Sequence, residues 1–199
     1  TGSQTPVGTS DNTYSIEWGT AKSSNYKITA TIGTLEVTEA TLKITVKDAT
    51  KTYNGDEQQG YTIASVTGTG STIETAEYKV EGLAEGDILT ITGYSPASGT
   101  HAATYTNGSF ENAEISIKSG DIDVTGSYTV EEKNVGKLTI EPAKLTITTE
   151  SAEKIYDGTE LKANGTISGF VPPDGGEQET AAFTVTGTQT LVGSSENTY

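Results

Sequence analysis

The chain has 199 residues, which is enough for one or two domains that each bury a modest core. Its formal net charge is −15 and it contains lysine but no arginine, which argues against nucleic acid or an anionic membrane surface as a partner. It has no cysteine, which excludes disulfides, thiol catalysis and zinc–thiolate sites. Hydrophobic residues make up only 32%, and Thr, Gly, Ser, Val, Ile and Tyr are abundant, so we expect a mainly β fold with little or no helix.

The first 14 residues form a block that returns at the end of the chain. Residues 1–14 read TGSQTPVGTSDNTY, and residues 186–199 read TGTQTLVGSSENTY. A weaker version at residues 92–105 keeps the Thr-Gly, Gly-Thr and Thr-Tyr pairs. Repetition on this scale predicts tandem β-sheet modules of similar structure, arranged as an elongated array.

Short segments that alternate apolar and polar residues occur along the whole chain, separated by Gly, Asn, Asp and Ser. This pattern predicts half-buried β-strands joined by turns. Only Ser71–Glu77 is a candidate for a short helical turn. In chain order, the expected strands are Tyr26–Ile32, Gly33–Val37, Ala40–Lys47, Tyr78–Val80, Ile88–Ile91, Ile115–Ile117, Tyr128–Val130, Leu145–Thr148 and Phe183–Val185.

The segment Gly33–Gly55 is repeated without a gap at Gly136–Gly158, 103 residues later. Its first part predicts the last strand of one module, and its second part predicts the first strand of the next module. Two residues, the second of them Glu39, separate these strands, and Pro142 takes the place of Glu39 in the second copy. So short a connector leaves little room for independent motion, and the proline ring stiffens the second junction further.

Each copy of this segment ends in a Tyr-Asn-Gly or Tyr-Asp-Gly sequence that predicts a tight turn. The residues concerned are Tyr53 and Gly55 in the first copy, and Tyr156 and Gly158 in the second. Asn and Asp side chains hydrogen-bond to the backbone of a turn, and Gly supplies the unusual backbone angles. Because the tyrosines return at equivalent places, we interpret them as packing or turn residues and not as a ligand-binding surface.

The order of these motifs resembles the MBG-type tandem repeat domains of bacterial extracellular and surface proteins, including adhesin-like proteins of Gram-positive bacteria. The resemblance rests on the segments ATLKITV, KTYNG, GLAEGDILT and GKLTIEP, and it covers essentially the whole chain. It implies a β-rich module, a β-sandwich or a β-grasp-like fold, that serves as a spacer or adhesive unit without catalytic residues. The proline that often follows the family's turn is absent after both Gly55 and Gly158, so the geometry of that loop is not transferred.

In the register of that family, residues 40–141 form a complete module. Residues 1–39 are the C-terminal part of a preceding module, and residues 142–199 are the N-terminal part of a following one. Partial modules expose unpaired strand edges, so we expect residues 142–199 of one molecule to pair with residues 1–39 of a neighbour. The rival interpretation divides the chain at the Thr-Gly blocks, into residues 1–91 and 92–199.

Residues with catalytic or metal-binding potential are scattered. His101 has no nearby nucleophile or orienting acid in the sequence. Asp121 and Asp123 lack the ligand spacing of a calcium loop. Glu177 and Glu179 give no sign of the fixed separation and burial that the two acids of a glycosidase need. We therefore predict no enzymatic activity, no metal site and no cofactor.

Trp18 is the single tryptophan and has no counterpart in the other repeats. Exposed aromatic rings are common contacts for sugars. The alternative function is therefore a carbohydrate-binding module, with Trp18 and neighbouring tyrosines as its contacts.

An internal amide bond between a lysine and an Asn or Asp side chain is a further open alternative. Lys51 and Lys154 recur just before the turn tyrosines. Their polar neighbours favour side chains that face the turn.

We expect this chain to be a segment cut from a longer cell-surface protein, held at the cell wall through regions outside the segment. Its role would be that of a stalk, a spacer or an adhesive unit. The expected partners are neighbouring modules, further copies joined head to tail, and a host or environmental glycan or protein.

Overall fold

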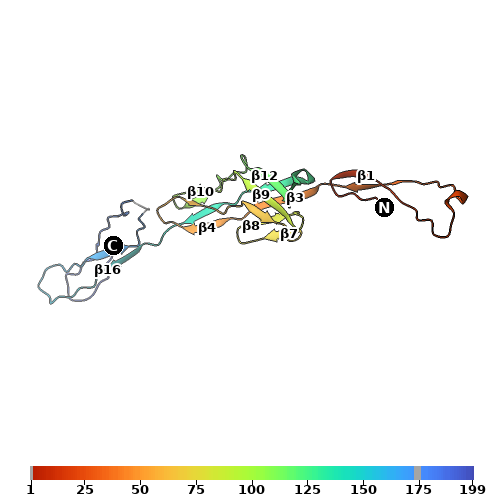
Figure 1. Ribbon diagram of the computed structural model, residues 1–199. Coiled ribbons are helices and arrows are strands. Elements are labelled where there is room, and N and C mark those ends of the chain that lie inside the picture. The colour runs from red at the N-terminus through yellow and green to blue at the C-terminus, as the bar shows by residue number, and fades with distance from the viewer. Residues whose placement is uncertain (1, 173–175) are drawn as a thin grey trace. The chain divides into compact units, whose positions relative to one another are not determined.

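The computed structural model describes residues 2–172 and 176–199. The fold is mainly β, as predicted, and the helical elements of the described part are two three-residue 3₁₀ helices, η1 (Ser23–Asn25) and η2 (Thr125–Ser127) (Figure 1). The helical turn expected at Ser71–Glu77 is wrong, because β7 (Thr72–Glu74) in this segment pairs with another strand. In the described ranges, no helix is long and apolar enough to cross a lipid bilayer.

The chain forms two compact units, each built from three separate stretches. The first consists of Thr1–Lys47, Tyr61–Pro96 and Gly108–Gly136, and the second of Asp48–Gly60, Ala97–Asn107 and Lys137–Tyr199. Residues 40–141, here called the middle copy, contribute to both units, so the predicted module boundaries stay a prediction. Residues 1–39 and 142–199 are called the N-terminal copy and the C-terminal copy.

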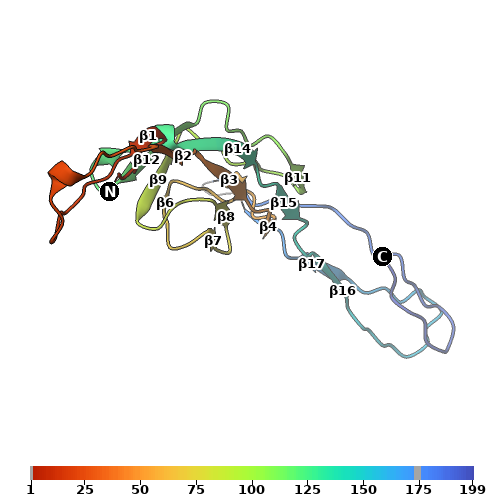
Figure 2. The same cartoon turned by 90° about the vertical axis from the view of Figure 1, so that its right-hand side faces the viewer.

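The first unit contains two four-stranded sheets and one two-stranded pair. The strand order is β14-β3-β8-β7 in one sheet and β13-β12-β9-β6 in the other, while β1 pairs with β2. β14 runs parallel to β3, and β8 runs antiparallel to it (Figure 2). The strands are β1 (Gly8–Asn12), β2 (Gly33–Val37), β3 (Ala40–Val46), β6 (Ser65–Thr67), β7, β8 (Tyr78–Glu81), β9 (Asp87–Thr92), β12 (Glu114–Ser119), β13 (Ile122–Asp123) and β14 (Tyr128–Asn134).

Both four-stranded sheets contribute to one hydrophobic core. Every second residue of β9 is buried, as is every second residue of β3 from Leu42 onward, and Leu42, Ile44 and Leu89 are completely inaccessible to solvent. Ile117 of β12 and Val80 of β8 join the same cluster. Full burial of an aliphatic side chain stabilises the folded state by about 1.5–3 kcal/mol relative to exposure, so this cluster is the main source of stability in the unit.

The second unit contains smaller sheets. In the three-stranded sheet β11-β15-β4, β15 runs parallel to β4 and antiparallel to β11, and its side chains Leu138 and Ile140 are buried. β10 pairs with β5, and β16 pairs with β17. The strands are β4 (Ala49–Thr52), β5 (Gln58–Gln59), β10 (Ser98–Gly99), β11 (Ala103–Tyr105), β15 (Leu138–Glu141), β16 (Thr146–Thr149) and β17 (Gly165–Ser168).

Two expected strands do not form ladders. Tyr26–Ile32 and Phe183–Val185 lie outside the strands of the structure, so both expectations are wrong. Their apolar–polar alternation decides which side chains share a face, but a strand also needs a partner that accepts and donates its backbone hydrogen bonds. Within the described residues, neither segment has such a partner.

The rival division at the Thr-Gly blocks would separate paired strands. The ladders β14–β3 and β15–β4 each join a strand before residue 91 to a strand after residue 92. Two self-contained domains, 1–91 and 92–199, are therefore inconsistent with the sheets.

Candidate functional site

The repeated turn has the same hydrogen bond in both copies. The Asn54 side-chain oxygen accepts a hydrogen bond of 3.1 Å from the backbone N–H of Asp56, and the Asp157 carboxylate accepts one of 2.9 Å from the backbone N–H of Thr159. The glycine between them has a positive φ, +88° at Gly55 and +79° at Gly158, which disfavours residues with a side chain. The geometry accounts for Asn or Asp followed by Gly at this place.

Only the second of these turns carries a lysine clamp among the contacts of the described residues. Lys154 Nζ donates hydrogen bonds of 2.8 Å to Asp157 Oδ1 and 2.6 Å to the carbonyl of Thr159. The lysine, and next the Thr159 backbone N–H, hold the pKa of the Asp157 carboxyl far below its usual range. Because this ion pair lies at the surface, its contribution to stability is small.

The two turn tyrosines have different surroundings. The Tyr53 hydroxyl donates to the Glu179 carboxylate, and this hydrogen bond is the main reason why the pKa of Tyr53 is raised. Tyr156 is 59% exposed. Tyr53 and Pro142 line a cavity of about 330 Å³, together with Leu145.

His101 borders this cavity, but its own contacts are structural. Its backbone N–H donates to the Tyr105 hydroxyl at 3.0 Å, and its carbonyl accepts from the same hydroxyl at 2.9 Å. The Tyr105 side chain therefore clamps the backbone around His101. Glu179 lines the same cavity, and its carboxylate accepts a hydrogen bond from Tyr53.

The first junction is as short as the sequence predicted. β2 ends at Val37 and β3 begins at Ala40. Glu39 in the connector accepts a hydrogen bond from the Thr129 hydroxyl, which ties the connector to β14.

Trp18 lies against Tyr26, with ring centroids 5.6 Å apart and the ring planes tilted by 31°. Trp18 is half-buried and Tyr26 is 60% exposed. This pair is a candidate contact surface for a sugar ring, and Tyr26 is the neighbour that the sequence alone did not single out.

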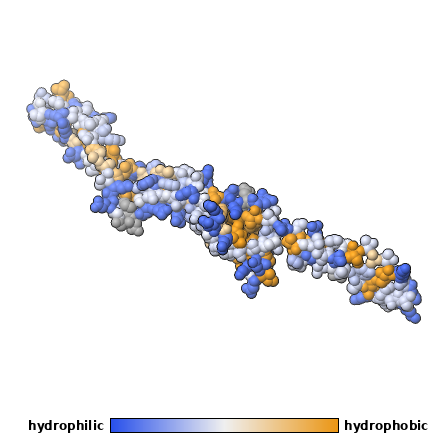
Figure 3. Space-filling view, turned by 90° about the horizontal axis from the view of Figure 1, so that it is seen from above, coloured by the Kyte–Doolittle hydropathy of each residue, from blue (hydrophilic) through white to orange (hydrophobic). Residues whose placement is uncertain are grey.

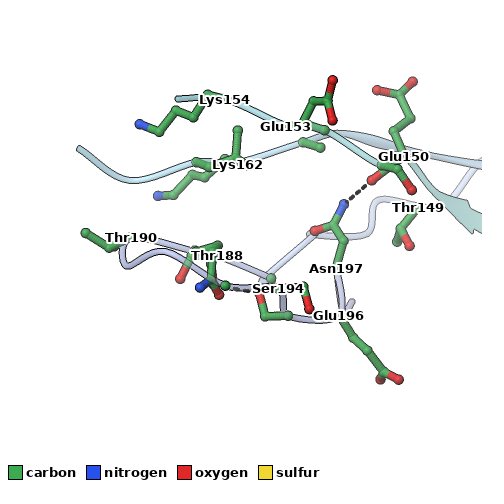
Figure 4. A pocket seen from close by; sticks show the side chains of 18 of the residues that line it. Thr149, Glu150, Glu153, Lys154, Lys162, Thr188, Thr190, Ser194, Glu196 and Asn197 are labelled. Atoms are coloured by element: carbon green, nitrogen blue, oxygen red, sulfur yellow. Dashed lines mark hydrogen bonds between the residues drawn. The ribbon is translucent and has the colours of Figure 1, made fainter. Parts of the chain in front are cut away.

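A larger hollow of about 890 Å³ lies in the C-terminal copy (Figure 4). It is lined by residues between Thr149 and Ala163 and by the block Gly187–Tyr199. At its wall, the Asn197 side chain donates a hydrogen bond of 2.9 Å to the Glu150 carbonyl (Figure 4). The lining carries both acidic and basic groups, among them Glu153 and Lys154, and therefore does not select one ligand charge.

The two terminal blocks repeat one local geometry. Gln4 Nε2 donates to the Pro6 carbonyl at 2.7 Å, and Gln189 Nε2 donates to the Leu191 carbonyl at 2.7 Å. The second residue of each block also bonds to the thirteenth: the N–H of Gly2 donates to the Thr13 carbonyl at 2.8 Å, and that of Gly187 to the Thr198 carbonyl at 3.2 Å. The sequence repeat is thus a structural repeat.

Clusters of acidic and histidine side chains that could hold a metal are absent from the described part of the chain. Asp123 instead accepts a 2.9 Å hydrogen bond from the backbone N–H of Thr125, which lowers the pKa of its carboxyl and marks a turn. The chain matches no model of a known protein family, no curated protein and no solved structure. The likeness to MBG-type repeats therefore stays an expectation from the sequence motifs.

Proposed function

We propose that this chain consists of non-catalytic, MBG-type repeat modules of a bacterial cell-surface protein, and that the modules act as a stalk that resists tension. The observation that carries the proposal is the parallel pairing of early strands with late strands of the middle copy. β3 pairs with β14, and β4 pairs with β15, in both cases in parallel.

Parallel pairing of first and last strands suits a protein that is pulled at its ends. Tension enters the middle copy at the start of β3, near Ala40, and leaves it after the end of β15, near Glu141. Because paired strands point the same way, such tension slides each pair lengthwise and loads its hydrogen bonds together. In an antiparallel pair pulled from one end, the bonds break one after another.

Single-molecule force spectroscopy on the whole chain tests this role. With handles at the two chain ends, we expect a high unfolding force for the middle copy. Handles at Glu85 and Asp121 are the matched control, because they pull apart the same ends of β9 and β12, where Asp87 faces Ser119. Equal forces in both geometries would contradict a tension-resisting stalk.

The surface location is a separate part of the proposal. It is supported by the acidic composition, the absence of cysteine and the repeated motifs. Antibodies raised against the chain should label intact source cells without permeabilisation. Labelling only after the cells are opened would place the protein inside the cell.

Carbohydrate binding is the second candidate, because the Trp18–Tyr26 ring pair is partly exposed. A glycan array would be probed with the chain and with its Trp18→Ala variant. Specific binding that the variant loses would favour a sugar-binding module over a passive stalk.

A further inference from the structure

We propose that a second copy of this chain docks head to tail, with Tyr26–Thr31 of one molecule pairing in parallel with Ala143–Thr148 of the next. A second parallel pair, Leu35–Thr38 with Ala152–Ile155, forms beside it. The inference rests on strand geometry and does not depend on the cell-surface role.

The middle copy shows both pairings completed within one chain. Tyr128 of β14 lies opposite Ala40 of β3, and Val130 lies opposite Leu42. In the other sheet, Leu138 of β15 lies opposite Ala49 of β4. The two terminal copies each contain one side of these pairings.

The N-terminal copy contains the counterpart of β14. η1 precedes Tyr26 as η2 precedes Tyr128, and the two tyrosines have nearly the same backbone angles, φ −127° and ψ 135° against φ −129° and ψ 137°. After the counterpart of β14 comes β2, which corresponds to β15 through the repeat of Gly33 at Gly136.

The apolar side chains of this segment are uncovered. The space-filling view shows hydrophobic residues at several places on the surface of the molecule (Figure 3). Tyr26, Ile28 and Ile32 are 60%, 51% and 44% exposed. Their counterparts in the middle copy pack against the hydrophobic core. Those counterparts are Tyr128, Val130 and Val135.

The C-terminal copy contains the counterpart of β3, and one edge of it is available. Gly169 follows β17 and lies so close to the carbonyl of Lys144 that a β-carbon would clash with it. Gly82 lies in the same way against the carbonyl of Thr41 in the middle copy. β17 therefore occupies the place of β8. The opposite edge, where β14 lies in the middle copy, has no partner strand among the described residues.

An apolar side chain marks this edge as well. Leu145 is 46% exposed, whereas its counterpart Leu42 is completely buried beneath the paired sheets. The predicted register places Ile28 of one molecule opposite Leu145 of the other. Burial of both side chains supplies a hydrophobic driving force for the pairing.

The 890 Å³ hollow supplies room for the second strand. One wall includes Ala152 and Lys154, which correspond to Ala49 and Lys51 of β4, and the other includes Tyr199, the counterpart of Tyr105 in β11. In the middle copy, β15 lies between β11 and β4. One edge of β2 is already paired with β1 of its own molecule, so β2 of a second molecule would pair through its other edge, with the wall that carries Ala152 and Lys154.

The N-terminal copy also fits the register without the irregularity of the middle copy. The β14–β3 ladder shifts register between Val130 and Glu132. The stretch from Tyr26 to Gly33 is one residue shorter than the stretch from Tyr128 to Gly136, so it needs no bulge. Because the two contact surfaces differ, the association is heterologous and can extend into chains of molecules.

The first test is the association of the full chain by sedimentation velocity over a wide concentration range. We expect oligomers whose formation Ile28→Asp weakens by at least about tenfold, because the charge would be buried in the interface. Ile122→Asp is the matched control, since Ile122 is 69% exposed and lies outside the predicted interface. A strict monomer, or equal effects of both variants, would overturn the proposal.

The second test fixes the register by disulfide formation, which the cysteine-free chain makes simple. A Thr29→Cys molecule mixed with a Thr146→Cys molecule should oxidise to a mixed dimer, because the two positions lie opposite each other in the predicted ladder. The control replaces the second partner by Thr190→Cys, an exposed position of the terminal block. Equal yields in both mixtures would reject this register.

The third test uses the charges that the register brings together. Lys27 would lie beside Lys144, so Lys27→Glu or Lys144→Glu alone should tighten association, and the double variant should restore the repulsion. Lys22→Glu makes the same change in net charge outside the ladder and should not tighten it. A double variant as tight as the single variants would contradict the proposed pairing.

Discussion

The Tyr128 hydroxyl donates a 2.5 Å hydrogen bond to the Asp87 carboxylate, which connects the start of β14 to the start of β9. The same hydroxyl accepts a 3.1 Å hydrogen bond from the backbone N–H of Ala84. Asp87 is only 8% exposed. The contact therefore satisfies a nearly buried carboxylate and joins the two four-stranded sheets of the first unit.

Replacing Tyr128 by Phe should destabilise the chain by about 1–3 kcal/mol, because the Asp87 carboxylate would lose its hydrogen-bond donor in a nearly buried position. Urea unfolding, monitored by far-UV circular dichroism, would measure the change in the free energy of unfolding. An unchanged midpoint would show that water replaces the hydroxyl without cost.

Replacing Tyr94 by Phe should leave stability unchanged or raise it by up to about 1 kcal/mol, since its buried hydroxyl has no hydrogen-bond partner among the described residues. The ring would keep its contact with Phe110, whose centroid lies 4.4 Å away. The same urea experiment applies, and this variant is the control for Tyr128→Phe. A loss as large as that of Tyr128→Phe would mean that both hydroxyls are bonded in solution.

Stability should fall at alkaline pH through these tyrosines. Burial raises the pKa of both Tyr94 and Tyr128 above 10.0, and the hydrogen bond to Asp87 raises that of Tyr128 further. A raised pKa means that the stabilising contribution is complete below pH 10.0 and is lost as pH rises through the folded-state values. A titration followed by tyrosinate absorbance should show that some tyrosines of the folded chain ionise at a higher pH than the rest. The Tyr128→Phe variant should have one fewer of these late-ionising tyrosines. Ionisation of all tyrosines in one step near their ordinary pKa would contradict this.

Alanine substitutions at Gly82 and Gly86 distinguish the energetic cost of backbone strain from that of a steric clash. Both have a positive φ, +88° and +84°, so alanine at Gly86 should cost about 1 kcal/mol through strain alone. At Gly82 a β-carbon would lie 1.9 Å from the Thr41 carbonyl oxygen, whereas the space around Gly86 is open. Gly82→Ala should therefore cost at least about 2 kcal/mol more than Gly86→Ala, because β8 must move away from β3. Equal midpoints in thermal unfolding would show that β8 is not held this closely.

The intact mass of the chain should equal that of its sequence. Lys154 Nζ lies 2.8 Å from Asp157 Oδ1, but the lysine and next the Thr159 N–H hold the pKa of this carboxyl well below its usual range, so it stays ionised and is a poor electrophile. Mass spectrometry would reveal an internal amide bond as a loss of about 18 Da. Such a loss would show that the pair reacts despite its ionisation.

Sequence patterns predicted the β class and the long strands β3, β9, β12 and β14 of the middle copy, but not short strands such as β4, β5 and β10. The alternation in Leu42–Val46 and Ile88–Ile91 matches the buried faces of β3 and β9. The recurring Asn-Gly and Asp-Gly pairs predicted turns because their hydrogen bonds involve only neighbouring residues. The Tyr128–Asp87 contact gave no such signal, since the two residues are far apart in the chain.

What the sequence determined by itself is therefore local or repeated: the turns at Gly55 and Gly158, the alternation of the strands, and the return of one block at both chain ends. Only the tertiary structure decided which strands pair. Tyr26–Ile32 and Tyr128–Asn134 have similar local patterns, yet only the second forms a ladder, with β3. The physical reason is that alternation fixes the face of each side chain, whereas pairing requires the backbone of a distant strand within hydrogen-bonding distance.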